Sequence, residues 1–79
     1  MPGLAHPRGI AVSENGEIYV AEHYSNERIS VWDANGTFLR DWGSQGTNDG
    51  QFKGPQGIAV FEGEVYITEE NSHRVQVFD

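Results

Sequence analysis

The sequence predicts an all-β fold made of two antiparallel β-propeller blades, each of a four-stranded type, with the second blade lacking its outer strand. The main observation is a repeat: residues 54–60 read Gly-Pro-Gln-Gly-Ile-Ala-Val, and residues 6–12 read His-Pro-Arg-Gly-Ile-Ala-Val, 48 positions earlier. The second is that the predicted strands are nearly continuous apolar runs. The third is that no stretch shows the apolar stripe of an amphipathic helix.

The repeat continues beyond this first segment. Residues 18–22 match residues 65–69 at an offset of 47, and residues 28–33 match residues 74–79 at an offset of 46. The second copy is therefore two residues shorter than the first, with one residue lost in each of two turns. Changes of length that spare the strands are typical of a structural repeat.

Each copy begins with proline and glycine in fixed places. Proline has no backbone N–H, so Pro7 and Pro55 suit the start of a strand rather than its middle. Two residues later, Gly9 and Gly57 allow another part of the backbone to pass close by.

Turn residues separate the strands that follow. Asn15 with Gly16, and Asn35 with Gly36, supply the positive φ that tight hairpins favour, and Glu62 with Gly63 turns the first hairpin of the second copy. The predicted strands are residues 9–12, 18–21, 28–32, 38–42, 57–60, 65–68 and 74–78. Residues 43–54 contain four glycines and are predicted to be a long loop without structure of its own.

The composition of the strands indicates how the two units pack. Residues 10–12 and 18–21 are apolar with little alternation, which is typical of strands covered on both faces. Antiparallel meanders that stack around a central axis cover both faces of each sheet, because each meander packs against its two neighbours. A solenoid would also cover both faces, but four antiparallel strands per unit favour a propeller.

These segments resemble the NHL repeat. The resemblance rests on Pro-Xaa-Gly-Ile-Ala-Val, Ile-Tyr-Val-Ala-Glu, and Val-Trp-Asp at residues 31–33, together with residues 26–29, 36–46 and 49–52. It covers nearly the whole chain and implies a β-propeller, commonly six-bladed. Residues 1–79 are then one NHL-repeat region, with blade 1 at about 6–43 and blade 2 at about 54–79. Glu22 and Glu69 stand where the family usually has Asp, and Ser72 where it usually has Asn.

The composition also bounds partners and location. Twelve carboxylates against five cations give a net charge of −7, which repels phosphate backbones and makes nucleic acid an unlikely partner. The sequence has no cysteine, which excludes disulfides and thiolate metal sites. No apolar run reaches the roughly 18 residues of a membrane span and no signal peptide is recognisable, so a cytoplasmic protein, or a piece of a longer chain, is expected.

The candidate site lies at one end of the blades. A meander brings the loops after the second strands to the same end as the starts of the first strands. The expected binding residues there are Arg8, Glu22, His23, Tyr24, Gln56, Glu69, Glu70 and His73. Glu22 with Arg28, and Glu69 with Arg74, bracket equivalent loops and are expected to form structural ion pairs.

Catalytic and metal sites find less support. Histidines and carboxylates in these loops could bind a metal, but they lack a spacing such as His-x-x-x-His, so solvated loop charges are favoured and no metal or cofactor is expected. No nucleophile motif is present, and no catalytic residue is predicted.

The resemblance implies a non-enzymatic module that binds a protein or peptide or serves as an assembly scaffold. Two alternatives remain open: part of a propeller enzyme of the metal-dependent lyase or lactonase class, and the RNA-binding module of a ubiquitin ligase, which the acidity disfavours.

Two blades alone leave two apolar outer faces exposed to solvent, so we expect a homotrimer unless the chain is part of a longer protein. The residues expected on the blade faces are Ile10, Val20, Ile29, Ile58, Ile67 and Val77.

Overall fold

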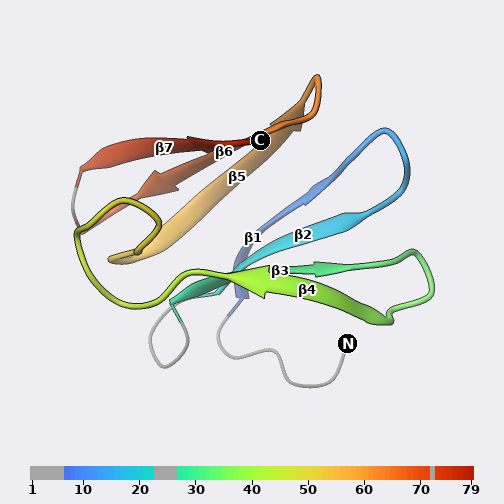
Figure 1. The fold of residues 1–79 in the computed structure, drawn as a ribbon, viewed down its shortest axis with the longest axis horizontal. Helices are drawn as coiled ribbons and strands as arrows, with labels where there is room; N and C mark the ends of the chain where they lie inside the picture. Colours follow the sequence, from blue (N-terminus) through green and yellow to red (C-terminus); the bar gives the residue numbers. More distant parts are fainter. Residues whose placement is uncertain (1–6, 23–26, 72) are drawn as a thin grey trace.

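The computed structural model describes residues 7–22, 27–71 and 73–79, which form two antiparallel sheets without a helix. The first sheet holds, in this order, β1 (Pro7–Val12), β2 (Ile18–Glu22), β3 (Arg28–Trp32) and β4 (Phe38–Trp42). The second holds β5 (Pro55–Phe61), β6 (Glu64–Glu69) and β7 (Arg74–Phe78). The predicted all-β fold of two blades, the second with three strands, is confirmed (Figure 1). Within these residues there is no helix long and apolar enough to cross a membrane.

Glycine closes the hairpins as expected, with one difference. The N–H of Gly16 donates to the carbonyl of Ser13 over 3.0 Å, and Gly36 bonds Asp33 in the same way. The positive φ falls on the glycines alone, 86° and 84°, and the preceding asparagines do not share it. This is the pattern of a type I turn followed by a left-handed glycine. The shorter β5–β6 hairpin instead places both Glu62 and Gly63 at positive φ, as a two-residue turn requires.

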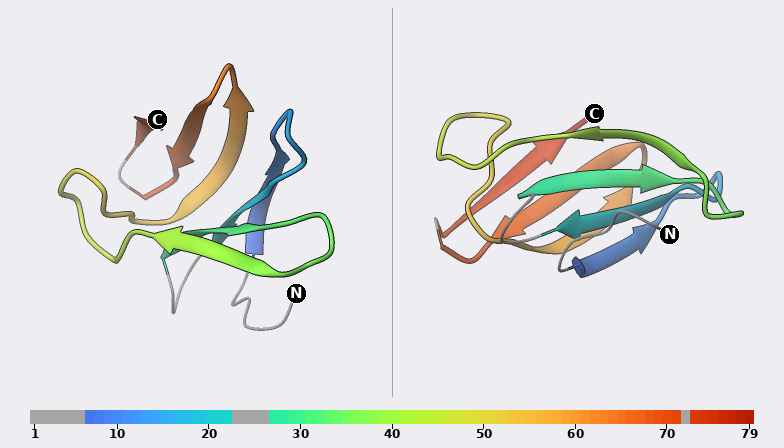
Figure 2. Two further views of the ribbon diagram at one scale, coloured as in Figure 1. Left: turned by 45° about the vertical axis from the view of Figure 1, so that its right-hand side comes forward. Right: turned by 90° about the horizontal axis from the view of Figure 1, so that it is seen from below.

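Gly9 marks the place where the blades come closest. β1 and β2 both lie against β5, as the views in Figure 2 show. A Cβ atom on Gly9 would collide with the backbone carbonyl oxygen of Gln56, at the start of β5. The repeat-equivalent Gly57 faces the hydroxyl of Thr68, to which its N–H donates over 2.9 Å. The expectation that these glycines permit close approach is confirmed, and only Gly9 meets the backbone of the other blade.

We expect Gly9→Ala to lower the free energy of unfolding by about 1–3 kcal/mol, because a collision with backbone forces the blades apart. Gly57→Ala is the matched control, since a Thr68 side chain can rotate away more cheaply than a strand can move. Urea unfolding followed by circular dichroism measures both variants. Equal midpoints for the two would contradict this account of the contact between β1 and β5.

The core lies between the two blades. Its buried side chains are Tyr19, Ala21, Ile29, Val31, Phe52, Val65 and Ile67, and Trp42, Ile58, Val60 and Phe78 pack against them. Most of these residues come from facing strands. Phe52 comes from the linker between the sheets, and it is fully buried.

The prediction that residues 43–54 hold no structure of their own is wrong. Phe52 donates its N–H to Ser44 over 2.7 Å and accepts from Gly46 over 3.0 Å, and Gln45 pairs with it in a parallel bridge. Glycine serves this packing, because a Cβ atom on Gly43 would collide with the Phe52 ring. The glycines therefore permit a compact loop rather than a loose one.

The outer faces differ in part from the expectation. Ile10 is 64% exposed and Val77 is 51% exposed, as expected for residues on outer faces that no blade covers. Ile29 and Ile67 are instead fully buried, because they point toward the neighbouring blade. Val20 is also buried; it pairs with Ser30, whose hydroxyl accepts a hydrogen bond from the Trp32 indole. Ile58 packs against the core and is partly buried.

Candidate functional site

One end of the molecule collects most of the polar side chains that the sequence singles out. β2 and β6 end here, β1, β3, β5 and β7 begin here, and the linker of residues 43–54 crosses from β4 to β5. We call this end the loop face, and define it as the linker, the β6–β7 turn and the starts of β1 and β5. Figure 1 shows the linker in yellow-green, between the two sheets.

Both bracketing pairs are in contact. Arg28 Nε lies 2.8 Å from Glu22 Oε2, and Arg74 Nε lies 2.7 Å from Glu69 Oε2. Both carboxylate side chains are fully buried. Arg28 reaches a second carboxylate, that of Asp41, over 2.6 Å. Burial acts to lower the pKa of the Arg28 guanidinium, but hydrogen bonds to Asp41 and Glu22 outweigh it and the pKa is raised.

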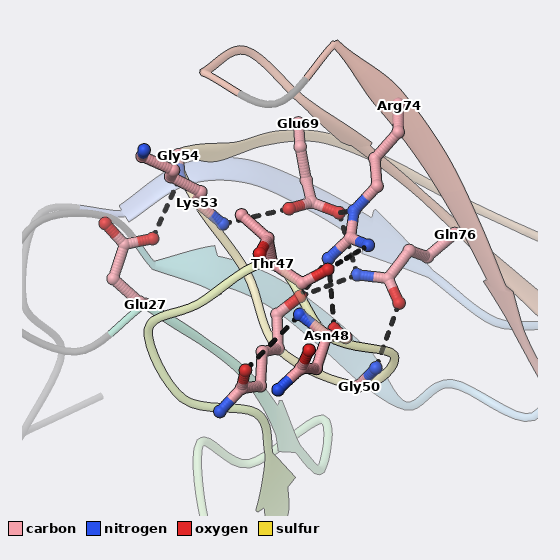
Figure 3. Close-up of polar contacts among 10 residues, drawn as sticks. Glu27, Thr47, Asn48, Gly50, Lys53, Gly54, Glu69, Arg74 and Gln76 are labelled. Carbon is pink, nitrogen blue, oxygen red and sulfur yellow. Dashed lines mark hydrogen bonds and ion pairs between the residues drawn. The ribbon is translucent and has the colours of Figure 1, made fainter.

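Arg74 does more than its counterpart in blade 1. Its guanidinium donates to three linker carbonyls, those of Thr47 (2.9 Å), Asn48 (3.2 Å) and Gln51 (2.7 Å), as Figure 3 shows. A guanidinium presents a rigid fork of donors, which suits several acceptors converging on one side. Arg74 therefore ties the linker to β7.

Gln76 is the next residue of β7 that faces inward, and it also binds the linker. Its Nε2 donates to the Gln51 carbonyl over 2.8 Å and to Glu69 over 2.7 Å, while its Oε1 accepts from the N–H of Gly50 over 3.1 Å. The amide thus bridges the linker and the buried carboxylate. It gives the Gly50 N–H an acceptor, and it adds a second donor to the Gln51 carbonyl and the Glu69 carboxylate, which Arg74 also contacts.

Two carboxylates capture consecutive linker amides, one from each blade. The N–H of Lys53 donates to Glu69 Oε1 and that of Gly54 to Glu27 Oε2, both over 2.9 Å (Figure 3). Glu27 is buried and has a left-handed backbone with φ of 48°. Its repeat equivalent, His73, shares that conformation with φ of 53°. We refer to Glu27, Glu69, Arg74 and Gln76 as the clamp.

The structure separates the predicted binding residues into two groups. Arg8, Gln56, Glu70 and His73 are exposed, whereas Glu22 and Glu69 are buried against their arginines. His23 and Tyr24 lie outside the described residues. The backbone N–H groups of Glu70 and Asn71 donate to Gly54 and Lys53, which joins the β6–β7 turn to the linker.

Sequence reasoning missed two clamp residues, Glu27 and Gln76. A signal for Gln76 was present, because the repeat places Gln76 where blade 1 has Ser30. A longer amide at one of two equivalent positions indicates an additional contact. Glu27 directly precedes the bracketing arginine, but nothing in its neighbours points to the amide of Gly54.

Two cavities lie away from the loop face. One of about 280 Å³ separates the tips of the β1–β2 and β5–β6 hairpins and is lined by Ser13, Glu14, Asn15, Tyr19, Val60, Glu62 and Gly63. The other, of about 230 Å³, is lined by Tyr19, Arg40, Trp42, Val65, Phe78 and Asp79. Beside it, a hydrogen bond from Arg40 holds the pKa of Glu17 below its usual value.

Across residues 7–22, 27–71 and 73–79, no three histidine or carboxylate side chains are placed to hold a metal ion.

Comparison with known proteins identifies the same two repeats as the sequence and the fold. The model of the NHL repeat matches residues 4–32 and 52–78, two segments that start 48 residues apart, like Pro7 and Pro55. The chain is 33% identical over 79 residues to the Drosophila melanogaster protein brain tumor, covering 96% of this chain and 8% of that protein. It is 29% identical over 82 residues to the Xenopus laevis peptidyl-glycine alpha-amidating monooxygenase B, covering 95% of this chain and 9% of the enzyme.

A third relative is shorter. The probable peptidyl-alpha-hydroxyglycine alpha-amidating lyase pgal-1 of Caenorhabditis elegans is 30% identical over 76 residues, covering 91% of this chain and 22% of that protein. In all three comparisons the chain spans a small part of the relative's length.

Proposed function

Because the chain belongs to the NHL-repeat family and forms two blades of a β-propeller, we propose that it is a non-enzymatic propeller module that binds a protein or peptide at its loop face. The clamp is the observation that carries this proposal. It holds a linker without regular strands or helices in one conformation, using side chains from both blades.

A held loop is suited to recognition. Binding residues are commonly found on loops that a rigid scaffold positions. A loop that is already ordered loses less conformational freedom on binding than a mobile one. The clamp fixes the backbone at Thr47, Asn48 and Gln51, while the side chains of Thr47, Asn48 and Asp49 remain exposed. These side chains supply polar groups on the loop face, which also includes Glu70 and His73.

Charge points to the kind of partner. The chain carries a net charge of −7. On the loop face the exposed carboxylates Asp49 and Glu70 are matched by two exposed cations, Arg8 and Lys53, so the negative charge that would select a partner is that of the chain as a whole. Complementary charge accelerates association and fixes which partner is accepted. A peptide or protein segment rich in lysine or arginine is therefore the ligand that we propose.

A displayed library of random peptides, selected on the immobilised chain, tests the proposal. We expect enrichment of basic peptides whose affinity falls several-fold in Glu70→Lys and Asp49→Lys and weakens with added salt. Glu14→Lys, a matched charge reversal at the opposite end, should leave the affinity unchanged. Peptides that bind all three variants alike would contradict a loop-face site.

RNA serves as the competing ligand in the same assay. Twelve carboxylates against five cations leave few groups to neutralise phosphates, so we expect weak binding of single-stranded RNA at about 150 mM salt. Sub-micromolar RNA affinity at that salt concentration would replace the peptide proposal with the nucleic-acid alternative.

The enzyme alternative has its own support in the similarity to two amidating proteins. Under that alternative, the two blades would supply part of a larger active site. Incubation of the chain with a peptidyl-α-hydroxyglycine and divalent metal ions shows whether copies of this chain can complete that site. Metal-dependent formation of the amidated peptide would favour the enzyme alternative over the binding module.

A further inference from the structure

We propose that the outer faces of the two blades bind each other between copies of this chain, head to tail, in an interface that repeats the one inside each copy. The two outer faces are the blade-1 outer face, which includes Ile10 and Val12, and the blade-2 outer face, which includes Val75 and Val77. The proposal is independent of peptide binding at the loop face. It rests on a comparison of repeat-equivalent residues, which are buried in one blade and exposed in the other.

The blade-2 outer face is equivalent to a face that is already buried. In the interface within the chain, blade 1 presents Ile29 and Val31, both fully buried. The 46-residue offset makes Val75 and Val77 their equivalents, and these are 59% and 51% exposed. Tyr19, which belongs to the same buried face, corresponds to Tyr66. Blade 2 therefore carries the apolar surface that blade 1 uses to bind a blade.

The blade-1 outer face is equivalent to the complementary half. In the interface within the chain, blade 2 presents Ile58 and Val60, which pack against the core. The 48-residue offset makes Ile10 and Val12 their equivalents, and these are 64% and 61% exposed. Val20, the equivalent of the buried Ile67, is already covered, so Ile10 and Val12 are the exposed part of this half of the interface. The exposed residues of each outer face thus correspond to residues of an interface that exists in the molecule.

These equivalences make a second copy of this chain the occupant that we propose, because it carries both of the matching faces. The blade-2 outer face of one copy matches the blade-1 outer face of the next, so the contact joins two different surfaces. Such a heterologous contact forms a ring when the rotation closes and an open chain when it does not. Three copies would supply the six blades that the resemblance to the NHL repeat implies. Each outer face exposes two large apolar side chains from one strand, and apolar side chains that gather at the surface mark interaction sites.

Two paired substitutions test the interface by complementation. Ile10→Lys with Val12→Lys blocks the blade-1 outer face, and Val75→Lys with Val77→Lys blocks the blade-2 outer face. We expect the unmodified chain to sediment as an oligomer at micromolar concentration and each doubly substituted chain to sediment as a monomer. An equimolar mixture should form a 1:1 dimer, because each partner retains the face that the other needs. Ala34→Lys, in the exposed β3–β4 turn, is the control and should leave the oligomer intact.

Each other result counts against the proposal. An unmodified chain that folds cooperatively and sediments as a monomer overturns it, whatever the variants do, and favours additional blades of a longer protein as the cover. Variants that still dimerise alone would show that like faces meet, which a head-to-tail contact does not allow. Circular dichroism of each variant separates loss of assembly from loss of folding.

Discussion

Phe52→Ala is expected to lower the free energy of unfolding by about 3–5 kcal/mol, the usual cost of truncating a buried phenylalanine. Phe52 is fully buried, and its ring centroid lies 5.9 Å from that of Phe78 in the opposite wall of the core. The ring also fills the space that Gly43 leaves open. A small domain has a net stability of only about 5–15 kcal/mol, so the variant should be partly unfolded or near it.

Thermal and urea unfolding, followed by circular dichroism at low concentration, measure this loss. Phe61→Ala is the matched control, because Phe61 is 63% exposed and its truncation should change stability by no more than about 0.5 kcal/mol. Phe52→Leu should fall between the two, since it keeps much of the apolar volume. Equal stability of Phe52→Ala and Phe61→Ala would show that the linker contributes nothing to the core.

The strands were predictable because their signals are local. Proline and glycine at the strand starts and glycine at the turns restrict the backbone over a few residues, and the repeat doubles each signal. The register of β6 with β7 places Glu69 opposite Arg74, as the register of β2 with β3 places Glu22 opposite Arg28. A meander with turns at known places leaves little freedom for other pairings.

The linker was not predictable in the same way. Four glycines within twelve residues lower the local preference for any one conformation, which suggests a loose loop. Its order comes from residues more than twenty positions away, such as Gln76 and Glu27, and from the burial of Phe52. Contacts of this kind depend on how the two blades sit together. The pattern of the linker alone does not contain that information.

The same reasoning applies to the faces of the blades. Apolar runs indicated that both faces need cover, but the runs do not say which side chain faces which neighbour. In the structure, Ile29 is buried between the blades, whereas Val75, its equivalent in the second blade, is exposed. Two copies of one pattern therefore occupy different environments because only one of them has a neighbour on that side.

Arg74→Ala is expected to cost about 3–5 kcal/mol, the range for breaking a buried ion pair by removing one partner. An exposed ion pair is worth no more than about 1 kcal/mol. The Glu69 carboxylate is fully buried, so the loss of its partner costs more. The substitution also leaves the carbonyls of Thr47 and Asn48 without the guanidinium that links them to β7.

Arg28→Ala is the matched control from the first blade, and it should cost a similar amount, because Arg28 also pairs with a fully buried carboxylate, that of Glu22. Its second partner, Asp41, lies on the neighbouring strand β4, so its loss does not release the linker. Hydrogen exchange distinguishes a role in the clamp from a general loss of stability. In Arg74→Ala the amides of Lys53 and Gly54 should exchange faster relative to those of β2 and β3, whereas in Arg28→Ala they should not. Uniform acceleration across both blades in Arg74→Ala would show that the arginine stabilises the fold without ordering the linker, and would remove the support that the clamp gives to a binding loop face.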